Sequence, residues 1–184
     1  MKALENLEAE VASEIVPVID VHRNLNPDKE LDKHLDSVCG QIARSWQNGH
    51  FVFDLFDLDA SLRIDSGEHP ARYTFDRLLD AGLSFIPCSG LDRDDAYNEQ
   101  VLEMVSENQS IAIRLQREDV QAPVFSIPQM SELIEYFGTD PSRVIVLLDF
   151  REIIANPIVL ASECAQFIDE VSEMGEWEAL VLSG

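Results

Sequence analysis

The stretch VIVLL (Val144–Leu148) decides the fold, because it is the most apolar run in the sequence. Asp140 and Pro141 form a turn before it. Beyond it, Asn156 and Pro157 have the character of a helix cap and a first-turn residue. A short, β-branched run between a turn and a helix start predicts a buried strand that is followed by a helix. This is the pattern of a parallel sheet whose faces are covered by crossover helices.

The same alternation extends from this run through the rest of the chain. The predicted strands are Glu14–Val21, Phe51–Leu58, Ser84–Cys88, Ile111–Leu115, Val144–Leu148 and Ala179–Leu182. The predicted helices are Lys2–Ala12, Leu31–Asn48, Ala71–Ala81, Asp94–Glu107, Ile127–Phe137 and a last one opened by Asn156 and Pro157. The expected fold class is therefore α/β: a partial (β/α) barrel, TIM-barrel-like, with about six parallel strands alternating with helices.

An open, doubly wound sheet is the alternative layout. The phosphate-binding fingerprints GxGxxG and GxxxxGK[ST] of that class are absent from the sequence. We expect a single β/α-repeat domain over residues 1–184. A complete barrel needs about 250 residues, so the chain is expected to lack the first strand and the C-terminal barrel elements.

Composition excludes several classes of function. The formal net charge is −22, and the basic residues are scattered singly, which disfavours nucleic-acid binding because the phosphates are repelled. No apolar run reaches the roughly 18 residues that cross a bilayer, and Met1–Ser13 lacks the core of a secretory signal. The cysteines Cys39, Cys88 and Cys164 form no disulfide framework or CxxC pair, which favours a reducing, cytoplasmic location.

Several ordered segments carry a resemblance to a known family. They are Ile15–Val21 with its proline, Ser45-Trp46 before Phe51–Leu55, His69-Pro70, Ile86–Asp94, Ile111–Leu115 with its arginine, and the apolar strand that ends in Asp149. Together they resemble the beta family proteins of bacteria and phages. The resemblance implies a β/α barrel longer than this chain, with one more strand before Leu4 and further elements after Gly184. It implies no established catalytic activity; the position of such genes near mobile and defence elements suggests a role in phage–host conflict.

Active sites of β/α barrels lie at the carboxyl ends of the strands, and acidic residues or arginines end every predicted strand but the last. We predict Asp20, Asp54 and Asp149 as catalytic residues, with Asp20 and Asp54 as ligands of Mg²⁺ or Mn²⁺, because hard cations take oxygen ligands. Guanidinium groups bind phosphate through paired hydrogen bonds. The predicted anion-binding residues are Arg23, Arg93, Arg114 and Arg151.

A structural interpretation competes with each of these assignments. Aspartate and arginine at strand ends also form salt bridges or helix caps, and Asp92 is expected to cap the helix at Asp94. His22 is a candidate general base but is more typical of an exposed loop histidine. Cys88 and Ser89 lack the G-x-S-x-G elbow of a nucleophile. Cys39 and Cys164 are expected in the core.

Three functions remain open from the sequence. The first is a binding or sensing role, with phage–host conflict as its setting. The second is a metal-dependent hydrolase acting on a phosphorylated small molecule. The third is a protein-interaction module, in which open sheet edges recruit a partner protein or further copies of the chain.

Overall fold

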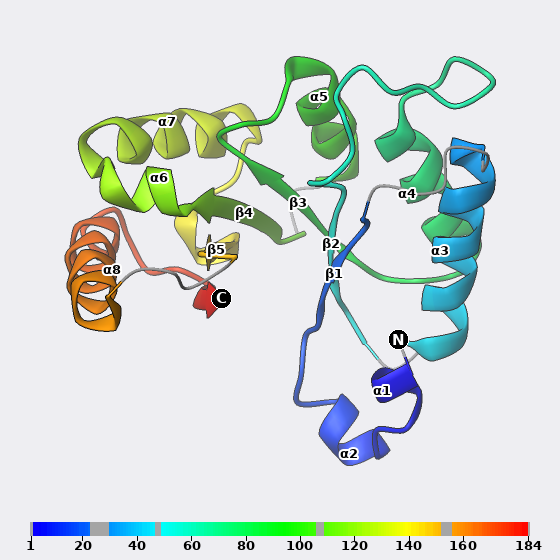
Figure 1. Cartoon of the computed structure of the whole chain (residues 1–184), viewed down its shortest axis with the longest axis horizontal. Coiled ribbons are helices and arrows are strands. Elements are labelled where there is room, and N and C mark those ends of the chain that lie inside the picture. Colours follow the sequence, from blue (N-terminus) through cyan, green and yellow to red (C-terminus); the bar gives the residue numbers. More distant parts are fainter. Residues whose placement is uncertain (1, 23–29, 47–48, 106–108, 152–155, 184) are drawn as a thin grey trace. The chain divides into compact units, whose positions relative to one another are not determined.

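A computed structural model describes residues 2–22, 30–46, 49–105, 109–151 and 156–183 (Figure 1). Its six strands are all parallel, and they follow one another in the order β1-β2-β3-β4-β5-β6. Helices alternate with the strands along the chain. The prediction of an α/β fold with six parallel strands alternating with helices is confirmed.

The chain groups into two compact units, residues 1–87 with 94–104 and residues 88–93 with 105–184. In the first unit, β1 (Val18–Asp20) pairs with β2 (Val52–Asp54), and β2 pairs with the first residues of β3 (Ile86–Gly90). Its helices are α1 (Lys2–Glu5), α2 (Ala9–Ala12), α3 (Leu31–Ser45), α4 (Pro70–Asp80) and α5 (Asp95–Met104).

Aromatic side chains fill the core of the first unit. The ring of Phe53, on β2, lies 6.2 Å from that of Phe75 on α4, and the rings of Phe75 and Phe85 stack at 5.2 Å. Phe51, Phe53 and Phe75 are completely buried. Burying such large rings stabilises the contact of α4 with one face of the sheet and fixes which face of β2 points away from the helix.

In the second unit, the last residues of β3 pair with β4 (Ile111–Gln116), which pairs with β5 (Val144–Asp149), which pairs with β6 (Ala179–Ser183). The helices are α6 (Arg117–Gln121), α7 (Pro123–Tyr136) and α8 (Pro157–Ser172), with a short 3-10 turn η1 (Pro141–Arg143) before β5. Every residue of β5 is buried, as the VIVLL run predicts.

Some element boundaries differ from the prediction. The expected helix Lys2–Ala12 is two short helices, because the chain turns where the Leu7 N–H donates to the Leu4 carbonyl. A helix of only a few turns that buries no large face is marginally stable, so one continuous helix is not favoured here. The expected strands Glu14–Val21 and Phe51–Leu58 shorten to three residues each.

Helix boundaries also move. The helix predicted as Leu31–Asn48 ends at Ser45, and Asn48 lies outside the described residues. The helix predicted as Ile127–Phe137 begins at Pro123, and a further helix, α6, precedes it that the hydrophobic period does not predict. A capping box explains α6: the Asp119 carboxylate accepts from the Gln116 N–H at 2.7 Å and stops β4 abruptly. The predicted cap Asn156 is confirmed, because its side chain accepts from the Ile158 N–H.

Candidate functional site

Two aspartates meet at the carboxyl ends of the first strands. Asp20 and Asp54 are direct partners in the β1–β2 register, so their Cα atoms are neighbours across the ladder. Asp54 is completely buried, and Asp20 is partly exposed. Strand alternation places both side chains on the face opposite Phe53, away from α4. The structure thus brings the two predicted metal ligands together on one face of the sheet.

A histidine–aspartate pair lies just beyond the same two strands. His22 Nδ1 lies 2.7 Å from Asp57 Oδ2, and the His34 side chain on α3 contacts the His22 carbonyl at 2.9 Å. The His22 side chain is 80% exposed and that of Asp57 is 30% exposed. An aspartate at Nδ1 orients an imidazole and sets its tautomer. The sequence places both residues at strand ends but gives no sign that they pair.

A buried ion pair joins the strand ends of the second unit. Arg114 Nε on β4 lies 3.2 Å from Asp149 Oδ2 on β5, and their side chains are only 7% and 9% exposed. Asp149 Oδ1 also accepts from the Arg151 N–H at 2.9 Å. Arg151 has a φ of 51°, a left-handed conformation that is uncommon for a residue with a side chain. Asp149 therefore links β4 to the backbone that leaves β5.

A second arginine, Arg93, lies three residues beyond the end of β3. The Arg93 side chain is 7% exposed and lies 3.6 Å from the Asp92 carboxylate. Asp92 in turn accepts from the Gln116 side chain on β4 at 3.0 Å. Gln116 is the register partner of Asp149. We call Asp92, Arg93, Arg114, Gln116 and Asp149 the arginine cluster.

Glycine is needed where β3 approaches this cluster. A Cβ atom built on Gly90 would lie 2.8 Å from the Arg114 carbonyl oxygen and 3.0 Å from Asp92 Oδ1. Gly90 and Arg114 are register partners, so the contact is with the neighbouring backbone and cannot be relieved by a side-chain rotation. The absence of a side chain at position 90 lets the two strand ends come together.

The electrostatics at the end of β4 reflect burial. Burial raises the pKa of Asp119 above its ordinary value, the charges of Asp92 and Glu118 add to the rise, and the hydrogen bond from the Gln116 N–H opposes it. The prediction that Asp92 caps α5 is wrong. Asp94 has that role, because its carboxylate accepts from the Tyr97 N–H at 2.9 Å. Asp92 instead reaches across to Gln116.

The remaining predicted anion-binding residues are Arg23 and Arg151. Arg23 lies outside the described residues. Arg151 is exposed, and the contact that ties it to Asp149 comes from its backbone. That the aspartates of the first unit and the arginine cluster of the second share one mouth stays a prediction. Cys39 and Cys164 are buried, as predicted for core residues.

Two further features lie outside the predicted set. The carboxylates of Glu30, Asp32 and Asp65 lie within 4.8 Å of one another, the one such group of potential metal ligands among the described residues. They are wholly or partly exposed, and Lys33 pairs with Glu30. Beside α8, a groove of about 580 Å³ is lined by apolar side chains that include Leu160, Cys164 and Leu182.

Comparisons with known proteins address the family and not the reaction. None of the helices in the described ranges is long and apolar enough to span a bilayer. Neither the curated proteins nor the solved structures contain a match to this chain. A family model described as Beta protein matches residues 1–184, which is the whole length. The ordered segments that suggested this resemblance are therefore supported across the sequence, and the chain belongs to the Beta protein family.

Proposed function

We propose that this chain binds a small anionic ligand at the arginine cluster. Its role would then be binding or sensing. The observation that carries the proposal is two arginine side chains, each 7% exposed, of which Arg114 lies on β4 and Arg93 follows the end of the adjacent parallel strand β3, in a chain of net charge −22. In β/α proteins, strand ends of this kind hold ligands. Buried guanidinium groups suit phosphate or carboxylate ligands through planar, paired hydrogen bonds.

Carboxylates of the protein hold these arginines in place. Asp149 contacts Arg114, and Asp92 contacts Arg93. An incoming anion would compete with Asp149 for the Arg114 guanidinium. Because Asp149 also holds the Arg151 N–H, its displacement would be transmitted to the backbone beyond β5. This competition provides a physical route from binding to a change in structure, as a sensor needs.

Thermal unfolding tests the proposal. Inorganic phosphate should raise the melting temperature of the wild type above that measured in sodium chloride of matched ionic strength, because a ligand of the folded state stabilises it. Arg114→Lys should lose most of this difference. Asp149→Asn should increase it, since the competing charge is removed, even though the variant itself is less stable. Arg72→Lys on α4 is the matched control and should behave as the wild type.

The Asp149 variant separates ligand binding from a purely structural role. If the ion pair only supports the fold, Asp149→Asn should lower the melting temperature equally in phosphate and in chloride. That result, together with an unchanged phosphate effect in Arg114→Lys, would contradict the proposal. A setting in phage–host conflict stays a prediction from the family resemblance.

A metal-dependent hydrolase of a phosphorylated small molecule is the second candidate. Two observations favour it: the Asp20–Asp54 register pair, and the 2.7 Å contact of His22 with Asp57 beyond the same strands. Carboxylates of this kind could hold Mg²⁺ or Mn²⁺. An imidazole oriented by a carboxylate is suited to proton transfer.

Metal titration tests this second candidate. Mn²⁺ should raise the melting temperature of the wild type and leave that of a folded Asp54→Asn variant unchanged. Turnover of p-nitrophenyl phosphate should then require the metal and fall in His22→Gln. A Mn²⁺ shift that persists in Asp54→Asn would remove Asp54 from the metal site, and the absence of any metal effect on the wild type would end the hydrolase candidate.

A further inference from the structure

The arginine cluster lies within the second unit, and its strand residues share one face of the sheet. Gln116 and Asp149 are register partners, and Arg114 precedes Gln116 by two positions on β4. Leu148 and Leu182 are also register partners, and Leu182 lines the groove beside α8. Because successive side chains of a strand point to opposite faces, Arg114, Gln116 and Asp149 lie on the face away from that groove.

Charges of both signs are balanced in this cluster. Arg93 and Arg114 contribute two positive charges, and Asp92 and Asp149 contribute two negative charges. Arg114 lies 3.2 Å from Asp149, and Arg93 lies 3.6 Å from Asp92. The cluster therefore offers acceptors for a cationic group directly beside the donors for an anionic group.

The buried ion pair restricts which ligand binds favourably. The side chains of Arg114 and Asp149 are only 7% and 9% exposed. An anion that takes Arg114 from Asp149 leaves a nearly buried carboxylate without its cation, which is unfavourable. A ligand that also carries a positive charge gives this carboxylate a new partner. Such a ligand has no net charge, so the field of a chain of charge −22 does not repel it.

Asp92 provides a second acceptor for a cationic group. Its side chain is 43% exposed, and its carboxylate accepts from the Gln116 side chain at 3.0 Å. Gln116 is the register partner of Asp149, so it connects Asp92 to the row of the ladder that contains Asp149. A primary ammonium group donates up to three hydrogen bonds and is suited to more than one carboxylate.

We propose that the ligand of the arginine cluster is an α-amino acid. Its carboxylate binds the guanidinium groups of Arg93 and Arg114, and its ammonium group faces the carboxylates of Asp92 and Asp149. An α-amino acid carries both groups on one carbon atom, which matches neighbouring side chains of opposite charge. This inference rests on the proposed anion binding at the same cluster and adds the chemical class of the ligand.

Melting temperatures in the presence of each protein amino acid test the proposal. Glycine betaine, a zwitterion without an N–H group, controls for the general stabilisation that osmolytes cause. Titration calorimetry then compares the amino acid of largest effect with its N-acetyl derivative, which keeps the carboxylate and loses the ammonium group. The free amino acid should bind about tenfold to a hundredfold more tightly, as expected for a hydrogen bond between charged groups.

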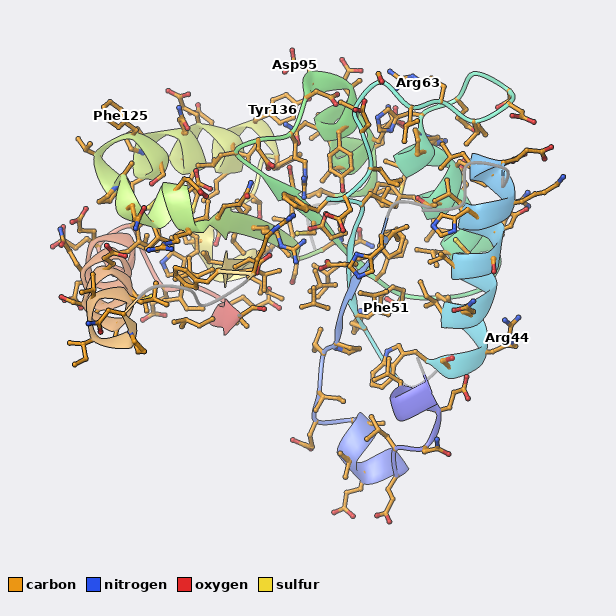
Figure 2. All side chains as sticks on the ribbon, in the orientation of Figure 1. Arg44, Phe51, Arg63, Asp95, Phe125 and Tyr136 are labelled. Atoms are coloured by element: carbon orange, nitrogen blue, oxygen red, sulfur yellow. The ribbon has the colours of Figure 1, made fainter. Side chains whose placement is uncertain are left out.

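Variants assign this preference to the two carboxylates. Asp149→Asn should weaken binding of the free amino acid but strengthen binding of the N-acetyl derivative and of phosphate, because it removes both an acceptor and a competing charge. Asp92→Asn should also reduce the preference, and it replaces Asp149→Asn if circular dichroism shows that variant to be unfolded. Glu132→Gln is the control: it removes an exposed carboxylate from α7, the helix that bears Phe125 and Tyr136 in Figure 2.

Three results would overturn the inference and leave anion binding in place. These are a wild type that binds phosphate but no amino acid, an N-acetyl derivative that binds as tightly as the free amino acid, and a preference that is unchanged in Asp92→Asn and in folded Asp149→Asn. If neither phosphate nor any amino acid binds the wild type, the anion-binding proposal fails as well.

Discussion

The guanidinium of Arg114 and the carboxylate of Asp149 meet 3.2 Å apart in a nearly buried ion pair between adjacent parallel strands. Removing charges from water is costly, and the pair offsets this cost only while both partners are present. Asp149→Ala should therefore destabilise the protein by roughly 3 to 5 kcal/mol, the range typical of breaking a buried ion pair by removing one of its charges. Denaturant unfolding at neutral pH measures the change.

A double replacement provides the comparison for this ion pair. Arg114→Met with Asp149→Leu should be less destabilising than Asp149→Ala alone, because both charges of this pair are removed together. Lys33→Ala, which removes an exposed pair with Glu30, should have little effect. Equal losses for the single and the double variants would contradict this account of the pair.

Position 90 should tolerate no side chain. Gly90→Ala places a Cβ atom 2.8 Å from the Arg114 carbonyl oxygen and forces β3 away from β4. Overpacking of this kind costs about 1 to 3 kcal/mol. Gly49→Ala is the control, since a Cβ atom there meets nothing within 4 Å. Melting temperatures should fall for the first variant only, and a Gly90→Ala protein as stable as the wild type would show that the strands have room to spare.

His69 should make stability depend on pH. Its Nδ1 accepts from the Ala71 N–H at the start of α4, which requires the neutral ring. Burial lowers the pKa of His69, the Arg63 charge lowers it further, and Asp94 opposes the change. The unfolded chain therefore binds this proton at a higher pH than the folded protein does. The free energy of unfolding should fall as the pH drops from about 6.5 until the folded His69 is also protonated.

His69→Asn isolates this contribution, because asparagine can cap the helix without titrating. Denaturant unfolding of both proteins between pH 7 and pH 5, at about one-unit steps, should show a smaller loss of stability for the variant. Parallel curves for the two proteins would mean that His69 gains its proton equally in the folded and unfolded states.

The buried thiols should be chemically inert in the native protein. Burial, with a contribution from Asp36, raises the pKa of Cys39 to about 11, and burial also raises the pKa of Cys164. Because the thiolate is the reactive form, iodoacetamide should modify both residues slowly at neutral pH and rapidly after denaturation. Mass spectrometry of the labelled peptides measures each rate. Fast labelling of native Cys39 would show that its helix opens readily.

Much of the fold follows from local sequence. The VIVLL run and the other apolar segments specify strands because burial on both faces requires continuous apolar residues, and the register of β4 with β5 then aligns Gln116 with Asp149. The lengths of the strands follow less well from the sequence. Leu55, for example, lies beyond the end of β2 but is still buried in the core, so its apolar character does not mark where strand pairing ends. The helix α6 was missed because its start depends on a hydrogen bond of Asp119 and not on a hydrophobic period.

The candidate site was predictable by position and not by contact. Strand ends identify Asp20 and Asp54 in the first unit and Arg114 and Asp149 in the second, since ligands of β/α folds are held at the carboxyl ends of the strands. The contact of His22 with Asp57 depends on two loop conformations, and the contact of Asp92 with Gln116 depends on how β3 ends. Such contacts join residues far apart in the sequence and leave no periodic signal in it.

Locating a bound anion tests the central claim most directly. Crystals soaked in tungstate, an electron-rich analogue of phosphate, should show an anomalous peak at the carboxyl ends of β3 and β4 within hydrogen-bonding distance of Arg93 and Arg114. The peak should be absent in Arg114→Lys. A tungstate site elsewhere on the chain, or an Arg114–Asp149 pair that stays closed with no anion beside it, would contradict the proposed ligand site.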